Sequence, residues 1–107
     1  MNPITRDELK LALESARAPM LLEALPEQYF RKGHLPGARH FPHDRARELA
    51  ALAVPDKDTP VVVYCASDTC HNSHQAAAAL SELGYRDVRV YVAGKADWEA
   101  AGLPLER

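Results

Sequence analysis

Residues 61–80 read VVVYCASDTCHNSHQAAAAL, and this segment carries most of the information about the architecture. The apolar run at 61–65 predicts a buried strand, and the alanine-rich run at 73–83 predicts a helix. The polar residues between them predict a tight loop. In α/β sheets, the loops at the carboxyl ends of the strands usually carry the chemistry. Cys65, which ends the apolar run, is therefore the first candidate for a functional residue.

Cys65 has the surroundings that convert a thiol into a nucleophilic thiolate. The backbone N–H groups of a tight loop and the N-terminus of the following helix both favour negative charge in the concavity between them. We therefore predict that Cys65 is a catalytic nucleophile. We expect the loop to form the substrate-binding surface around it, through Ala66, Ser67, Asp68, Thr69, Cys70, His71 and Asn72.

The chain as a whole restricts the classes of function. Its length of 107 residues predicts one domain over residues 1–107. The net charge of −2, with both signs interspersed, argues against a nucleic-acid or membrane partner. No apolar run approaches the roughly 18 residues of a membrane span. Together with the polar, acidic N-terminus, these features lead us to expect a cytoplasmic protein with reduced cysteines.

Strands and helices alternate along the rest of the chain. The apolar patterns predict strands at 20–25, near 38–41, at 61–65 and at 88–92. Helices are expected at 6–17, 44–52, 73–83 and 96–101, with a helical turn at 26–30 and Gly84 ending the third of these helices. This alternation predicts an α/β fold with a central, mostly parallel sheet flanked by helices on both faces.

Four segments in order resemble a rhodanese-like (sulfurtransferase) domain, and together they cover nearly the whole chain. They are the strand and turn at 21–29, the Gly-His-Leu-Pro-Gly-Ala segment at 33–38, the cysteine loop with its helix at 64–77, and the C-terminal signature at 83–104. The resemblance implies a rhodanese-like fold and a sulfurtransferase that carries sulfane sulfur as a Cys65 persulfide. The implied partners are a small sulfur donor, thiosulfate or a persulfide, and a thiol acceptor that is a small molecule or a protein. We expect no cofactor and no metal.

The loop departs from the family pattern, and this affects the expected donor. It is longer than in a typical member, and Asn72 stands where the family has a basic residue. A loop without arginine loses bidentate recognition of oxyanions. We therefore expect poor turnover of thiosulfate and a better fit to a neutral or protein-bound persulfide. Positive charge near the loop would have to come from His71, His74 or Lys95.

Cys70 lies five residues after Cys65 and leaves several interpretations open. One is a resolving thiol, which displaces the sulfur carried by Cys65 and leaves a disulfide. Another is a small, partly buried residue that fills a long loop. The two cysteines with His71 and His74 also form a candidate tetrahedral zinc set, although zinc ligands more often come in pairs from separated segments.

Other functions fit the same residues. A non-catalytic rhodanese-like module could use Cys65 and Cys70 for binding or redox sensing. A phosphatase or arsenate reductase can share this fold, but such enzymes need a loop arginine to bind the oxyanion, and residues 66–72 contain none. In the scaffold, we expect His34 to have a structural role and Glu23 to pair with Arg39.

Overall fold

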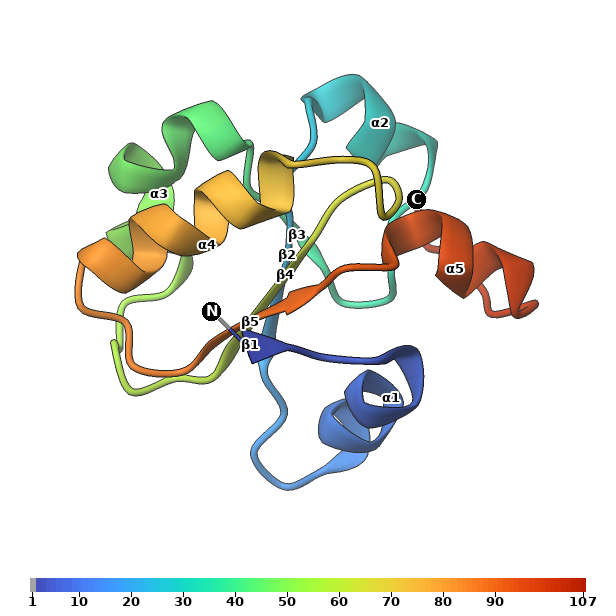
Figure 1. The fold of residues 1–107 in the computed structure, drawn as a ribbon, viewed down its shortest axis with the longest axis horizontal. Helices are drawn as coiled ribbons and strands as arrows, with labels where there is room; N and C mark the ends of the chain where they lie inside the picture. The colour runs from blue at the N-terminus through green and yellow to red at the C-terminus, as the bar shows by residue number, and fades with distance from the viewer. Residues whose placement is uncertain (1) are drawn as a thin grey trace.

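The computed structural model describes residues 2–107 and is built on a five-stranded parallel sheet in the order β1-β5-β4-β2-β3 (Figure 1). The strands are β1 (Asn2–Pro3), β2 (Met20–Glu23), β3 (Arg39–His40), β4 (Val61–Tyr64) and β5 (Val88–Tyr91). The helices are α1 (Arg6–Glu14), α2 (Glu27–Lys32), α3 (Ala46–Ala53), α4 (Asn72–Glu82) and α5 (Gly94–Ala100), with a 3₁₀ turn, His43–Arg45, before α3. The predicted fold class is confirmed.

Two hydrophobic cores form on the two faces of the sheet, because successive side chains of a strand point to opposite faces. Val61 and Val63 of β4 pack on one face with residues of α3 and α4. Val62 and Tyr64 pack on the other face with Leu9 of α1 and Trp98 of α5. Helices therefore cover both faces, as the sequence predicted (Figure 1).

Strand β4 lies at the centre of this arrangement. It pairs with β2 on one side and β5 on the other, with Tyr64 opposite both Glu23 and Tyr91. All four of its residues are buried, which explains why its sequence is continuously apolar rather than alternating. The chain leaves β4 at the carboxyl edge of the sheet, and Cys65 is the first residue beyond it.

The observed elements differ from the predicted ones mainly at their ends. Strand β1 was not predicted, since two exposed residues carry no strand pattern; it forms by pairing with β5, and the Ile4 N–H donates to the Val90 carbonyl at 2.9 Å. Helix α1 ends at Glu14, because Ser15 is extended. Thr5 and Glu8 form a capping box at the start of this helix.

Helix α4 ends at the glycine that the sequence indicated. Gly84 has a φ of +98°, the left-handed conformation that favours glycine. Its N–H donates to the Ser81 carbonyl, and the Tyr85 N–H donates to the Leu80 carbonyl, each at 3.1 Å. This pair of hydrogen bonds is a Schellman motif, which satisfies carbonyls at the end of the helix and directs the chain into β5.

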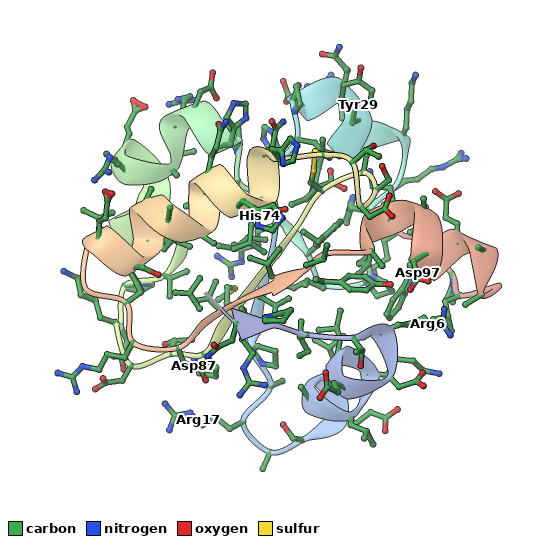
Figure 2. The ribbon with its side chains drawn as sticks, viewed as in Figure 1. Arg6, Arg17, Tyr29, His74, Asp87 and Asp97 are labelled. Carbon is green, nitrogen blue, oxygen red and sulfur yellow. A yellow bond between two sulfur atoms is a disulfide. The ribbon has the colours of Figure 1, made fainter. Side chains whose placement is uncertain are left out.

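The two helices on one face of the sheet are joined by polar contacts. Nη1 of Arg6 in α1 lies 3.1 Å from Oδ1 of Asp97 in α5, and Figure 2 shows both side chains at this junction. The Tyr91 hydroxyl donates to the other oxygen of Asp97 at 2.6 Å. Among residues 2–107, no helix has the length and apolar character needed to cross a membrane.

Candidate active site

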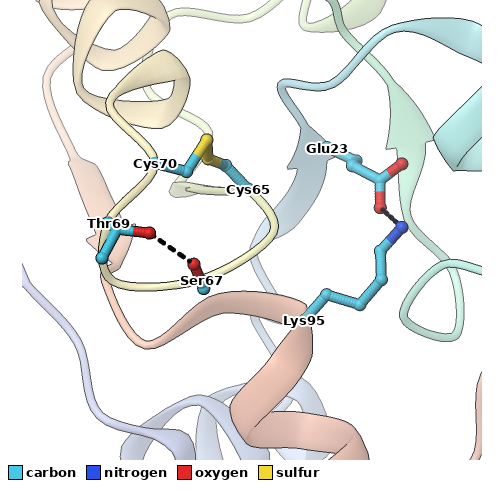
Figure 3. Close-up of a disulfide and its surroundings, with 6 residues drawn as sticks. All are labelled: Glu23, Cys65, Ser67, Thr69, Cys70 and Lys95. Atoms are coloured by element: carbon cyan, nitrogen blue, oxygen red, sulfur yellow. Dashed lines mark hydrogen bonds and ion pairs between the residues drawn. A yellow bond between two sulfur atoms is a disulfide. The ribbon is translucent and has the colours of Figure 1, made fainter.

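The loop between β4 and α4 brings the two cysteines of the chain into a covalent bond. Cys65 follows β4 and retains only 1% of its surface exposed, while Cys70 is partly exposed just before α4. Their Cα atoms lie 6.2 Å apart and their sulfurs form a disulfide (Figure 3). The expectation of reduced cysteines thus differs from the structure, which shows the oxidised form of the loop.

Few internal hydrogen bonds stabilise this loop. The Cys70 N–H donates to the Ser67 carbonyl at 3.1 Å, and the Ser67 and Thr69 hydroxyls lie 3.0 Å apart (Figure 3). Within residues 2–107, the amides of Ala66, Ser67, Asp68 and Thr69 have no protein acceptor. The Asp68 side chain is exposed, as expected for a carboxylate that would oppose an anionic substrate. Unpaired amides beside a cysteine are donors that an anion can use.

The start of helix α5 holds the base of the loop. The Lys95 N–H donates to the Cys65 carbonyl at 2.9 Å, and the Ala96 N–H donates to the Ala66 carbonyl at 2.8 Å. Gly94 allows this close approach, because a Cβ at that position would lie 2.6 Å from the Cys65 carbonyl oxygen and 2.9 Å from the Ser67 nitrogen. No local pattern indicates this role for Gly94, whose only signal is that a glycine follows two residues after the predicted strand at 88–92.

The expected pair of Glu23 with Arg39 is wrong. The register of β2 and β3 places Arg39 opposite Leu22, so its side chain points to the face of the sheet away from Glu23. Glu23 is instead paired with Lys95, whose Nζ lies 2.6 Å from its Oε1 (Figure 3). The same ammonium donates to the Tyr29 carbonyl at 3.2 Å. Lys95 is therefore engaged and does not supply free positive charge to the loop.

Tyr64 joins the site to the Gly33–Ala38 segment. Its hydroxyl accepts a hydrogen bond of 3.0 Å from the Leu35 N–H. Burial, reinforced by the nearby Glu23 carboxylate, raises the pKa of Tyr64 far above its usual value, so this phenol is neutral at physiological pH. Tyr64 therefore serves as a buried hydrogen-bonding group beneath the site.

His34 has contacts that match the structural role expected from the sequence. Its ring stacks on Phe30 with centroids 3.8 Å apart, and its Nδ1 lies 3.0 Å from the Phe30 carbonyl oxygen. Its backbone exchanges hydrogen bonds with Glu106 in a short antiparallel bridge. These contacts attach the Gly33–Ala38 segment to the C-terminal segment of the chain.

The histidines at the start of α4 do not assemble a metal site with the cysteines. The rings of His71 and His74 have centroids 6.2 Å apart, and Cys65 and Cys70 are bonded to each other. In the part of the chain that the structure describes, no three His, Cys, Asp or Glu side chains gather as metal ligands. The zinc interpretation therefore has no support in residues 2–107.

A parallel α/β sheet that places a cysteine loop between its central strand and the next helix is an architecture suited to cysteine-dependent chemistry. The family described as "Rhodanese-like domain" matches residues 5–101, and the chain belongs to this family.

Two curated relatives and one solved structure illustrate the similarity. The thiosulfate sulfurtransferase PspE of Escherichia coli K12 is 44% identical over 64 residues, which are 60% of this chain and 59% of PspE. The HTH-type transcriptional regulator Rv0324 of Mycobacterium tuberculosis is 31% identical over 105 residues, which are 98% of this chain and 45% of that protein. The chain therefore spans about half the length of these relatives. A solved structure of "rhodanese with anions from E. coli" is 31% identical with a TM-score of 0.70, covering 84% of this chain and 99% of that one.

Proposed function

We propose that residues 1–107 form a single-domain sulfurtransferase in which Cys65 carries sulfane sulfur as a persulfide. One observation supports this most directly. The sulfur of Cys70 is bonded to that of Cys65 inside the loop, so there is room for a second sulfur beside the buried Cys65. In a Cys65 persulfide the outer sulfur would take the place of the Cys70 sulfur, with Cys70 reduced and displaced, and the amides of Ala66, Ser67, Asp68 and Thr69, which have no protein acceptor, are its proposed hydrogen-bond donors.

Loading begins from the reduced loop. The Cys65 thiolate attacks the sulfane sulfur of the donor, a new S–S bond forms, and the bond within the donor breaks. The leaving group takes the electron pair of the broken bond. It is sulfite when the donor is thiosulfate, and a thiolate when the donor is an organic persulfide. The amides of the loop and the N-terminus of α4 stabilise the negative charge of the outer sulfur.

Unloading follows one of two routes. In the first, an acceptor thiolate attacks the outer sulfur, takes it as a new persulfide and releases the Cys65 thiolate. In the second, Cys70 is a resolving thiol, whose thiolate attacks the Sγ atom of Cys65. Hydrosulfide then leaves with the electron pair of the broken bond, and the product is the Cys65–Cys70 disulfide found in this structure.

The charges around the loop favour a donor that is not a dianion. The Lys95 ammonium is paired with Glu23, and the Asp68 carboxylate is exposed in the loop. Loop amides without arginine bind thiosulfate weakly. We therefore propose a neutral or protein-bound persulfide as the better donor, and a small thiol or a protein thiol as the acceptor. A cytoplasmic location suits this reaction, because a reducing compartment supplies the thiols.

A second candidate function is a rhodanese-like module that binds a partner or senses oxidants without transferring sulfur. The disulfide between Cys65 and Cys70 is the observation that favours it. Thiol alkylation of the reduced protein separates the two functions. A Cys65 thiol that reacts rapidly at neutral pH supports the enzyme, whereas an inert thiol supports the module.

The intact mass of the reduced protein tests the main proposal. After brief incubation with thiosulfate and, separately, with an organic persulfide, we expect a gain of one sulfur atom that Cys65→Ser eliminates. Cys70→Ser should retain the added sulfur and release less hydrosulfide. No gain of sulfur with either donor, in both the parent and Cys70→Ser, would overturn the proposal. Equal hydrosulfide release from Cys70→Ser and the parent would exclude the resolving role.

A further inference from the structure

We infer that the Cys65–Cys70 disulfide opens by attack of an external thiolate on Cys70, so that Cys65 is released directly as the thiolate. The inference rests on the proposed function, because it concerns how Cys65 returns to the state that accepts sulfur. It assigns Cys70 a second role, as the contact point for a thiol or dithiol reductant. The mixed disulfide formed on the way is then carried by Cys70 alone.

The two sulfurs differ in how they can be reached. Cys65 is 1% exposed, at the end of the fully buried strand β4. Cys70 is partly exposed, and both of its chain neighbours, Thr69 and His71, are exposed. Attack on a disulfide needs the incoming thiolate to approach one sulfur from the side opposite the other. We therefore expect the incoming thiolate to reach Cys70 from the solvent side, whereas an approach to Cys65 requires the surrounding structure to open.

The base of the loop makes such an opening costly at Cys65. Its carbonyl accepts a hydrogen bond of 2.9 Å from the Lys95 N–H, and Gly94 packs directly against the same carbonyl. The Cys70 N–H donates only to Ser67, within the loop itself. The half of the loop that carries Cys65 is thus attached to helix α5, while the Cys70 N–H bonds only within the loop.

One effect acts in the opposite direction. Cys70 lies just before the N-terminus of α4, which stabilises a thiolate there and so favours Cys70 as the leaving group. Stabilisation at a helix terminus changes a thiolate equilibrium by about two- to thirtyfold. About half of that effect, on a logarithmic scale, appears in the exchange rate, which therefore changes by no more than about sixfold. Burial of the competing sulfur restricts the approach itself, so accessibility decides the direction.

The first step needs no reactant other than the attacking thiolate. The electron pair of the attacking thiolate forms a bond to the Cys70 sulfur, the bond between the two cysteines breaks, and its electron pair leaves on the Cys65 sulfur. A second thiolate, from a dithiol reductant or another molecule of monothiol, then attacks the mixed disulfide and releases Cys70. Each cycle oxidises two thiols of the reductant and reduces one disulfide of the protein.

Glutathione is a suitable probe for the position of attack. The oxidised protein, identified by the loss of two hydrogens from its intact mass, is exposed briefly to limiting glutathione and quenched with N-ethylmaleimide. Both cysteines lie on one tryptic peptide, since residues 58–85 contain no Lys or Arg. Fragment ions that break between Cys65 and Cys70 show which sulfur carries glutathione and which carries the maleimide.

We expect glutathione on Cys70 and maleimide on Cys65, in at least about tenfold excess over the reverse. The matched control is the same reaction on the oxidised protein unfolded in guanidinium, where burial no longer distinguishes the sulfurs and the ratio should fall to within about threefold of unity. Glutathione mainly on Cys65, a folded ratio equal to the unfolded one, or failure of the disulfide to form with a mild oxidant would each overturn the inference.

This result is independent of the sulfur-loading experiment. Loading starts from reduced protein and measures a gain of sulfur at Cys65, whereas the exchange experiment starts from oxidised protein and needs no sulfur donor. Preferential attack on Cys70 without any sulfur loading would support the redox module and retain the inference. If the reduced protein gains sulfur but glutathione attacks both cysteines equally in the oxidised protein, the sulfurtransferase function is supported and the inferred preference for Cys70 is wrong.

Discussion

Lys95 and Glu23 form a buried ion pair, in which Nζ lies 2.6 Å from Oε1. The Glu23 side chain is 0% exposed and that of Lys95 is 12% exposed. Within residues 2–107, neither carboxylate oxygen of Glu23 has a partner in directed hydrogen-bond geometry. The contact is therefore an attraction between two charges in a poorly hydrated setting, and each charge depends on the other to offset the cost of its burial.

Replacing Lys95 with alanine should destabilise the protein strongly. The Glu23 carboxylate would remain buried without its counter-charge, at a cost of about 3 kcal/mol in the free energy of unfolding. Urea denaturation followed by circular dichroism measures this loss. Lys10→Ala, at an exposed position of α1, is the control and should stay within about 0.5 kcal/mol of the parent. A Lys95→Ala protein as stable as Lys10→Ala would show that the pair contributes nothing.

Replacing Gly94 with alanine should destabilise the protein by more than the strain of a positive φ, because the new Cβ would also collide with the loop. Gly94 and Gly102 have similar φ values, +71° and +77°, but a Cβ at 94 would contact the Cys65 carbonyl at 2.6 Å and a Cβ at 102 would contact nothing within 4 Å. We expect Gly94→Ala to cost at least about 1 kcal/mol more than Gly102→Ala in thermal or urea unfolding. It should also slow sulfur loading at Cys65, which Gly102→Ala should leave unchanged. Equal costs for the two variants would refute the proposed close packing.

Introducing arginine at position 72 should improve the use of thiosulfate. Asn72 is the first residue of α4, directly beside the loop, and a guanidinium there would bind the sulfonate oxygens bidentately. We expect Asn72→Arg to lower the KM for thiosulfate about tenfold, with little change for a neutral organic persulfide. Ser81→Arg, at an exposed position near the opposite end of α4, adds the same charge away from the loop and serves as the control. An unchanged KM for thiosulfate in Asn72→Arg would argue against missing oxyanion recognition as the limitation.

Alkaline pH should unfold the protein through its buried tyrosines. Burial raises the pKa of Tyr64, Tyr85 and Tyr91 above the ordinary value of 10.0. Their stabilising effect is fully present below pH 10 and is lost as the pH rises above it, because the unfolded chain releases phenolic protons that the folded protein retains. Each such tyrosine contributes a slope of up to about 1.4 kcal/mol per pH unit.

The contribution of one tyrosine to this pH dependence can be isolated. Tyr64→Phe should flatten the decline in unfolding free energy between about pH 10 and 11.5, measured by urea denaturation at a series of pH values. Tyr29→Phe is the control, since Tyr29 is 46% exposed and its variant should follow the parent curve. If Tyr64→Phe also followed the parent curve, Tyr64 would ionise as readily in the folded protein as in the unfolded chain.

Much of the fold follows from patterns between neighbouring residues. Periodicity and local conformation were enough to predict three features that the structure shows. They are the strand in the apolar run at 61–65, the helix in the alanine-rich segment after the loop, and the end of that helix near Gly84. The position of Cys65 at the carboxyl end of the central strand could be predicted for the same reason. Strand β1 could not, because two exposed residues become a strand only by pairing with β5.

The contacts that organise the site depend on segments distant in sequence. The pairing of Glu23 with Lys95 was missed because the register of β2 and β3 decides which face of the sheet Arg39 occupies. The role of Gly94 became visible only when α5 was seen packed against the base of the loop. Local periodicity was sufficient to predict strands β2 to β5, the loop and the placement of Cys65. Which charges and which sulfurs meet could not be predicted in this way, because these contacts depend on register, on the faces of the sheet and on the path of the loop.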